Sequence, residues 1–232
     1  MILEVRDLVS GYQNKKVLHG LSLQMEEGDV IGIIGHNGAG KTTFLKSLFG
    51  LLVPWQGQII YQGRNIAGRK PETNVQEGIA FMPQGQGLFP DLTIMENLEM
   101  SSFGLDEVTF KRRVRNVFEL FPILEERKKQ RAGTLSGGEQ RMLSLSLTLM
   151  REPTLLFLDE PSLGLAPRIV QLVMSTIADI NRQFHNSIIL VEQNFEQVKK
   201  VAQKIVVIKL GKIVFSGILD PSMDKRELWK YF

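Results

Sequence analysis

Short apolar runs alternate along this chain with longer segments in which apolar residues recur every three or four positions. Several runs are apolar at nearly every position, which is typical of strands buried on both faces of a parallel sheet. These runs span residues 30–34, 78–82, 154–158, 187–191 and 204–208. Segment 168–184 has a helical period instead, carried by Ile169, Leu172, Val173, Thr176, Ile177, Ile180 and Phe184. The alternation predicts an α/β fold with a mostly parallel core sheet.

Two regions depart from this pattern. Near the start, residues 2–8, 17–25 and 57–63 alternate apolar and polar positions or end in glycine turns, which predicts an N-terminal antiparallel β subdomain. Residues 89–151 lack strong strand signals and read as helical, so we expect an inserted helical subdomain of about these bounds. The expected organisation is a single domain over residues 1–232, with its core in 1–88 and 152–232.

Composition excludes several classes of protein. The 232 residues are 43% apolar and 23% charged, as in ordinary globular proteins, and a net charge of +3 gives no reason to expect a nucleic-acid partner. The absence of cysteine excludes disulfides, thiolate metal sites and a cysteine nucleophile. No apolar run approaches the ~20 residues that span a bilayer, and acids at positions 4 and 7 argue against a secretory signal.

A glycine-rich loop, "GHNGAGKT" at residues 35–42, follows the run 30–34 and precedes a helical segment. Its spacing is that of a phosphate-binding P-loop, in which backbone N–H groups and a helix N-terminus face the phosphates of ATP. Lys41 is expected to reach the β- and γ-phosphates, and the Thr42 hydroxyl to hold Mg²⁺. The expected ATP-binding residues here are Gly35, His36, Asn37, Gly38, Ala39, Gly40, Lys41, Thr42 and Thr43. A plain helix-capping turn is the alternative.

A second acidic element is expected to complete such a site. The stretch "TLLFLDEP" (154–161) is an apolar strand that ends in Asp159 and Glu160. Asp159 is the expected Mg²⁺ ligand, and Glu160 the expected base that polarises the attacking water. The alternative is an acidic turn ahead of Pro161.

A third motif, "TLSGGEQRM" at residues 134–142, narrows the class. Ser136 with Glu139 three residues later predicts a capping box at the start of a helix, and the two glycines leave an exposed anion site. Together with the P-loop, this motif closely resembles the signature of the ATP-binding cassette (ABC) ATPases. The resemblance covers the entire chain and implies the ABC ATPase form of the P-loop NTPase fold, with ATP and Mg²⁺ as cofactors.

The resemblance implies roles for further residues. Tyr12 matches the aromatic residue that stacks on adenine, although it could equally be surface packing, and Gln84 matches the glutamine that contacts Mg²⁺ and water and senses the membrane partner. The signature residues would contact ATP held by the P-loop of a second ABC ATPase subunit. Those residues are Ser136, Gly137, Gly138 and Gln140. The implied assembly binds a membrane permease, which implies a cytoplasmic protein at the inner face of the cell membrane.

Two positions depart from the family pattern. Ala166 and Pro167 stand in the segment "SLGLAP", where the family usually has Asp, and Gln193 in "LVEQN" stands where it usually has a γ-phosphate-sensing His. Both features are similar to the second ATPase of branched-chain amino acid importers and of the related urea and amide importers. Gln can donate a hydrogen bond but cannot become a cation near neutral pH, so we expect weaker catalysis. The alternative is a Gln that only caps the loop after its strand.

The resemblance therefore predicts an ATPase that powers solute import, with branched-chain amino acids as the expected solute. A urea or amide importer, an exporter and a weakly hydrolysing regulatory partner stay open, and a soluble ABC protein of ribosomes or DNA is a remote alternative. Whether the dimer contains one kind of chain or two also stays open. Residues 88–98 are expected either to dock on the permease or to form a satellite core.

Overall fold

Strands and helices follow one another as the hydrophobic pattern predicts. The computed structural model describes residues 1–85, 87–220, 222–223 and 225–231. Its strands are β1 (Leu3–Tyr12), β2 (Lys15–Met25), β3 (Val30–Ile34), β4 (Gln56–Tyr61), β5 (Arg64–Asn65), β6 (Ile79–Met82), β7 (Leu155–Asp159), β8 (Ser187–Val191), β9 (Lys204–Lys209) and β10 (Lys212–Ile218). Its helices are α1 (Lys41–Phe49), α2 (Pro71–Gln76), α3 (Ile94–Ser101), α4 (Glu107–Leu120), α5 (Pro122–Glu126), η1 (Ala132–Thr134), α6 (Gly137–Leu149), α7 (Pro167–Phe184), α8 (Phe195–Val198), α9 (Lys225–Leu228) and η2 (Trp229–Tyr231).

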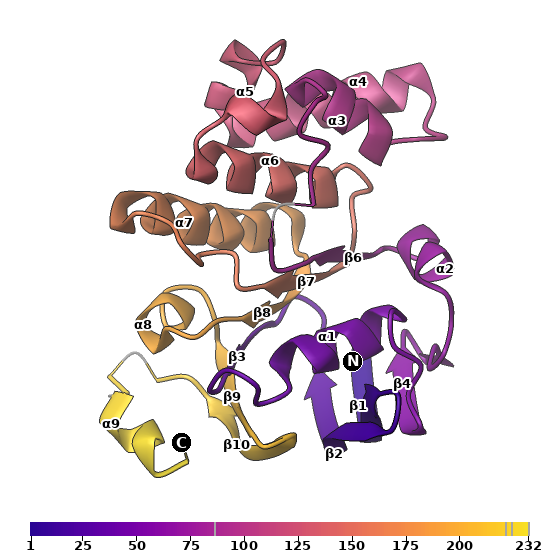
Figure 1. Ribbon diagram of the computed structural model, residues 1–232, viewed down its shortest axis with the longest axis vertical. Helices are drawn as coiled ribbons and strands as arrows, with labels where there is room; N and C mark the ends of the chain where they lie inside the picture. Colours follow the sequence, from indigo (N-terminus) through magenta and orange to yellow (C-terminus); the bar gives the residue numbers. More distant parts are fainter. Residues whose placement is uncertain (86, 221, 224, 232) are drawn as a thin grey trace.

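The strands assemble into two sheets (Figure 1). Over the described residues, the larger sheet has the order β10-β9-β3-β8-β7-β6 and the smaller one the order β2-β1-β4-β5. The strands from β9 to β6 are parallel, β10 pairs antiparallel with β9, and the smaller sheet is antiparallel throughout. The predicted combination of a mostly parallel core sheet with an N-terminal antiparallel sheet is confirmed.

Each central strand of the larger sheet is buried on both faces. Leu155 and Phe157 of β7 belong to the core that contains α1 and the antiparallel sheet. Leu156 and Leu158 of the same strand belong to a second core with α7 and α6. Because successive side chains of a strand point to opposite faces, a strand covered on both sides must be apolar at every position. This explains the unbroken apolar runs of the sequence.

Helices α3 to α6 form a layer beyond α7, at the top of Figure 1. The chain enters this layer after β6 and leaves it before β7, and the predicted helical segment 89–151 contains all four helices. Capping boxes begin two of them, with Thr93 and Glu96 at α3 and Ser136 and Glu139 at α6. The exact division of the chain into a core and a helical subdomain stays a prediction.

Two local features differ from the pattern in the sequence. Leu172 and Phe184, which carry part of the helical period of 168–184, are 44% and 46% exposed. The buried stripe of α7 consists instead of Val170, Val173, Met174, Thr176, Ile177 and Ile180. Strand β10 was not expected, because an edge strand with exposed alternate positions carries little apolar signal. Within the described ranges, no helix combines the length and apolarity that a membrane crossing requires.

Candidate nucleotide-binding site

The loop between β3 and α1 forms one wall of the site. Gly40 stands at the N-cap of α1 with φ 106°, a left-handed conformation that favours glycine, and no side chain caps the helix there. The first N–H groups of α1 therefore remain available to an anion. Lys41 is buried, and its Nζ donates to the carbonyl oxygens of Gly35 at 2.8 Å and His36 at 3.2 Å. Burial lowers the pKa of Lys41, and the nearby carboxylate of Glu160 opposes that shift.

Strand β7 ends at Asp159, a fully buried carboxylate beside this loop. Neither of its oxygens makes a hydrogen bond of good geometry with another described residue. Burial raises the pKa of Asp159, and the Thr42 hydroxyl is near enough to lower it in part. An unpartnered carboxylate beside a hydroxyl is a donor set that fits Mg²⁺, a hard cation that takes oxygen ligands.

The fit to Mg²⁺ does not need a cluster of protein ligands. The described residues contain no group of three or more His, Cys, Asp and Glu side chains that could hold a metal. At nucleotide sites, Mg²⁺ usually takes one or two protein ligands and completes its shell with phosphate oxygens and water. The protein ligands predicted for Mg²⁺, namely Asp159, Thr42 and Gln84, are therefore enough to hold the ion together with phosphate and water.

Glu160 is the point at which side chains from neighbouring elements meet. Its Oε2 accepts hydrogen bonds from Gln84 Nε2 at 3.1 Å and from Gln193 Nε2 at 2.9 Å. Its Oε1 lies 3.8 Å from Lys41 Nζ. Gln84 follows β6 and Gln193 follows β8, the two strands that flank β7 in the sheet. Parallel strands deliver the residues at their carboxyl ends to the same edge, which brings these three predicted side chains together.

A cavity of about 560 Å³ opens at this edge of the sheet. The predicted site residues in its lining are Tyr12, Asn37, Gly38, Gly40, Lys41, Thr42, Thr43, Gln84, Glu160 and Gln193. Tyr12 is 42% exposed, and its hydroxyl accepts a weak hydrogen bond from Thr43 Oγ1 at 3.5 Å, so its ring remains accessible. Lys15 and Lys16 also line the cavity, and the sequence analysis did not single them out. Their charges suit a polyphosphate ligand.

The signature residues lie elsewhere. None of Ser136, Gly137, Gly138 and Gln140 belongs to the described lining of this cavity. Ser136 begins α6 with its capping box, and Gln140 Nε2 donates to the Ala132 carbonyl at 3.0 Å. A Cβ on Gly138 would lie 2.6 Å from Ile169 Cγ2, so glycine is needed there for close packing on α7. Gly137 and Ser136 are the exposed part of the motif.

Gln193 faces Glu160 and does not cap the following helix. The cap of α8 is the next residue, Asn194, whose Oδ1 accepts from the Glu196 N–H at 3.0 Å. Two buried charged residues nearby were missed by the sequence analysis, Glu192 on β8's end and Arg141 in α6. The signal for Glu192 was an acid directly after a fully apolar strand, the same signal that identified Asp159 and Glu160.

Comparison with known proteins places this chain in a family. Residues 18–163, more than half of the chain, match the family model described as ABC transporter. The high-affinity branched-chain amino acid transport ATP-binding protein BraG of Pseudomonas aeruginosa is 43% identical over 90% of this chain and 89% of its own. The probable branched-chain amino acid transport ATP-binding protein LivF of Archaeoglobus fulgidus is 31% identical over 99% of this chain and 97% of its own.

The fold agrees with this assignment. The solved structure of cbiO1 from Clostridium perfringens, part of the ABC transporter complex cbiONQ, superimposes with a TM-score of 0.87 at 26% identity, covering 99% of this chain and 93% of its own. The P-loop, the strand that ends in Asp159 and Glu160, and the signature helix are thus found in a chain whose whole length matches known cassettes. The chain belongs to the ATP-binding cassette (ABC) transporter ATPase family.

Proposed function

We propose that this chain is the ATP-hydrolysing subunit of a membrane importer for branched-chain amino acids. The observation that carries the proposal is the convergence of Lys41, Gln84 and Gln193 on Glu160, beside the buried Asp159. The names of the BraG and LivF relatives support the solute class. A urea or amide importer is the second candidate, because the Gln193 feature is shared with that branch.

The proposed chemistry follows from the hydrogen bonds at the site. The γ-phosphate oxygens of ATP replace the Gly35 and His36 carbonyls as partners of Lys41 Nζ, and the N–H groups at the start of α1 contact the phosphates. Glu160 accepts a proton from the attacking water, and the Gln84 and Gln193 amides hold its carboxylate in place. Asp159, Thr42 and Gln84 would hold Mg²⁺, which supplies neutralisation of the phosphate charge.

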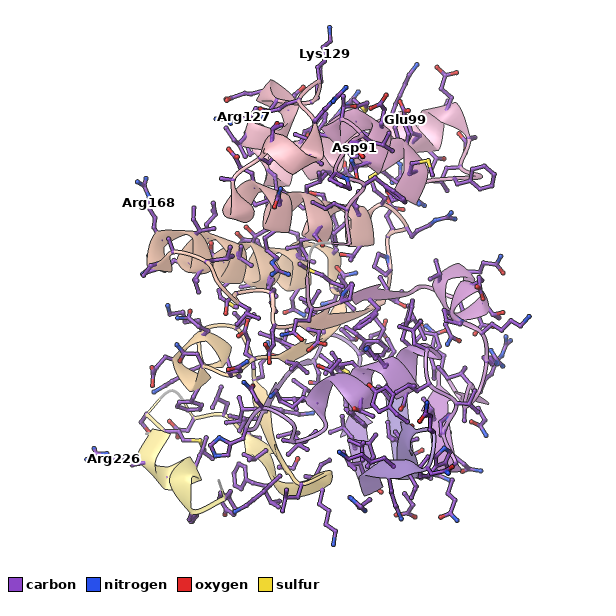
Figure 2. All side chains as sticks on the ribbon, in the orientation of Figure 1. Asp91, Glu99, Arg127, Lys129, Arg168 and Arg226 are labelled. Atoms are coloured by element: carbon purple, nitrogen blue, oxygen red, sulfur yellow. The ribbon has the colours of Figure 1, made fainter. Side chains whose placement is uncertain are left out.

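The proposed assembly contains two such cassettes and a permease at the inner face of the cell membrane. The exposed Ser136 and Gly137 at the start of α6 are the surface proposed to meet ATP bound to the second cassette. Arg127 and Lys129 project outward at the top of the helical layer in Figure 2, and Arg127 pairs with Glu139 at 3.3 Å.

The exposed apolar side chains of Phe89, Met100, Phe103 and Val108 are proposed to form the patch that docks on the permease. These side chains are 50%, 53%, 84% and 79% exposed. The predicted docking segment 88–98 supplies only Phe89 to this patch, since Ile94 and Leu98 are fully buried. Those two residues belong to the core that the helical layer and α7 share with the larger sheet, and the proposed patch extends beyond residue 98.

The test is transport by the complete system. The chain is co-purified with the permease and partner cassette encoded beside it, reconstituted into vesicles with the matching binding protein, and supplied with Mg²⁺ and ATP. Leucine, isoleucine and valine are expected to enter the vesicles only when ATP is present. Urea is not expected to enter with or without ATP. Uptake of urea instead would overturn the solute class. A complex that binds ATP without hydrolysing it would overturn the catalytic role.

Gln193→His is expected to raise the single-turnover rate of ATP hydrolysis, by about tenfold, because an imidazole can carry positive charge toward the γ-phosphate and an amide cannot. The measurement uses a rapid-quench assay with the chain in excess over ATP. Gln193→Asn is the matched control. It keeps the amide, but its side chain is one methylene shorter and cannot make the present hydrogen bond to Glu160. It is expected to be slower than wild type. A Gln193→His rate equal to wild type would contradict the sensing role of position 193.

A further inference from the structure

Strand β8 ends in two adjacent residues that contact the Glu160 turn from two sides. Gln193 Nε2 holds the Glu160 carboxylate, at 2.9 Å. Glu192 holds the backbone of the same turn, because its Oε1 accepts from the Ser162 N–H at 2.9 Å. The first contact acts on the reacting group itself, and the second fixes the peptide segment that carries it.

The turn needs such anchors. Glu160 has φ 51°, a left-handed conformation that is strained for a residue other than glycine. Strain of this kind persists only where the surroundings over-determine the backbone. The Glu160 N–H donates to the Val191 carbonyl at 2.9 Å, and two residues later the Ser162 N–H donates to Glu192. The turn is thus tied to the end of β8 on both sides of Pro161.

Glu192 is itself held firmly. It is 3% exposed, and its own N–H donates to the Ile33 carbonyl of β3 at 3.1 Å. A buried carboxylate is unfavourable unless it is hydrogen-bonded, and the contact with Ser162 meets that need. Burial raises the pKa of Glu192, and the hydrogen bonds from Ser162 lower it in part.

The charged groups around Glu192 come from three elements. Burial lowers the pKa of Lys41 in α1, and the charge of Glu192 opposes that shift. The charge of Glu160 after β7 adds to the raising of the pKa of Glu192 by burial. Arg141 of α6 is also near, and the charge of Glu192 opposes the lowering of its pKa by burial. Arg141 in turn donates to the Gly85 carbonyl, next to Gln84, at 2.6 Å. The charge of Glu192 thus acts on groups from the turn, the P-loop and the signature helix.

We propose that Glu192 is a positioning residue that holds the Glu160–Ser162 turn in the conformation required for hydrolysis. The proposal rests on the proposed function, in which Glu160 is the base. Glu192 is not among the described residues that line the cavity, and it acts through the backbone of the turn that carries Glu160.

The test separates rate from binding. Glu192→Ala is expected to lower the single-turnover rate of ATP hydrolysis by about tenfold, less than the roughly hundredfold that a 1 Å misplacement can cost, with ATP affinity changed less than about twofold. Glu192→Gln keeps an oxygen that can accept the Ser162 N–H, and is expected to stay within about threefold of wild type. An unchanged rate in Glu192→Ala, or a Glu192→Gln variant as slow as the alanine variant, would overturn the proposal.

A double-mutant cycle distinguishes a positioning role from a purely structural one, because only a positioning role makes the effect of Glu192→Ala depend on Glu160. In the Glu160→Gln background, Glu192→Ala is expected to lower the residual rate by less than about twofold, because the group it positions is already gone. A tenfold loss in that background as well would overturn the proposal. Glu160→Gln alone tests the proposed function, so a fully active Glu160→Gln variant contradicts the base assignment and a fully active Glu192→Ala variant contradicts only the positioning role.

The matched control is Asp29→Ala. Asp29 Oδ2 accepts from the Glu26 N–H at 2.8 Å in the turn before β3, so it is also a carboxylate that holds a backbone turn. That turn lies at the opposite end of β3 from the P-loop. Asp29→Ala is expected to lower the melting temperature and to leave the hydrolysis rate unchanged. An equal loss of rate in this control would show that weakening any turn slows ATP hydrolysis. That result would overturn a specific role for Glu192.

Discussion

Glu160→Gln is expected to lower steady-state ATP hydrolysis by about a hundredfold or more, since removing a positioned general base typically costs that much. The amide has almost the same shape as the carboxylate but cannot accept a proton from water. Its oxygen can still accept a hydrogen bond from Gln84 or Gln193, so the side chain keeps a partner in its present place. The loss should therefore appear in the rate and not in ATP affinity, which is measured with a fluorescent ATP analogue.

The same variant should reveal the two-cassette assembly. If hydrolysis is what reopens the closed dimer, Glu160→Gln with Mg²⁺ and ATP should elute as a dimer in size-exclusion chromatography, and wild type should return to the monomer as ATP is consumed. Glu77→Gln is the control, because Glu77 makes a partly exposed ion pair with Arg69 at 2.9 Å, and neither residue is among the described residues that line the cavity. A Glu160→Gln variant that hydrolyses ATP at the wild-type rate would contradict its assignment as the base.

The parts of this site that the sequence could predict are the contiguous ones. The spacing of Gly35, Gly40 and Lys41 fixes a phosphate loop wherever a strand precedes it and a helix follows it. The apolar run that ends in Asp159 and Glu160 likewise needs no knowledge of neighbouring strands. Both motifs are local, so the hydrophobic pattern and the residue spacing carry all the information they need.

The parts that could not be predicted depend on strand order and packing. That Gln84 and Gln193 both reach Glu160 follows from the placement of β6 and β8 on either side of β7, which the hydrophobic period does not encode. Glu192 holding Ser162 requires the same neighbour relation. Gly138 resembles an open anion site in the sequence, but it packs against Ile169 of a helix far along the chain.

Lys41→Met is expected to abolish ATP hydrolysis and also to destabilise the nucleotide-free protein. Lys41 is 5% exposed, its Nζ lies 3.8 Å from Glu160 Oε1, and the charges of Asp159 and Glu192 act on it as well. Methionine fills the space of the stem but leaves these carboxylates uncompensated. Removing one partner of a buried charge pair commonly costs about 3 kcal/mol of unfolding free energy, to be measured by urea denaturation.

The pH dependence of that loss gives a sharper test. Burial already raises the pKa of Asp159 and Glu192, and without the Lys41 charge both should rise further. A carboxyl whose folded pKa lies above its unfolded value of about 4 contributes stability at low pH, and that stability is lost as the pH rises through the folded value. The melting-temperature gap between wild type and Lys41→Met should therefore widen as the pH is raised above the unfolded value of about 4. Lys111→Met, which breaks an exposed pair with Glu107, should show no such widening. A gap independent of pH would mean that Lys41 does not offset the buried carboxylates, and that its part is confined to binding phosphate.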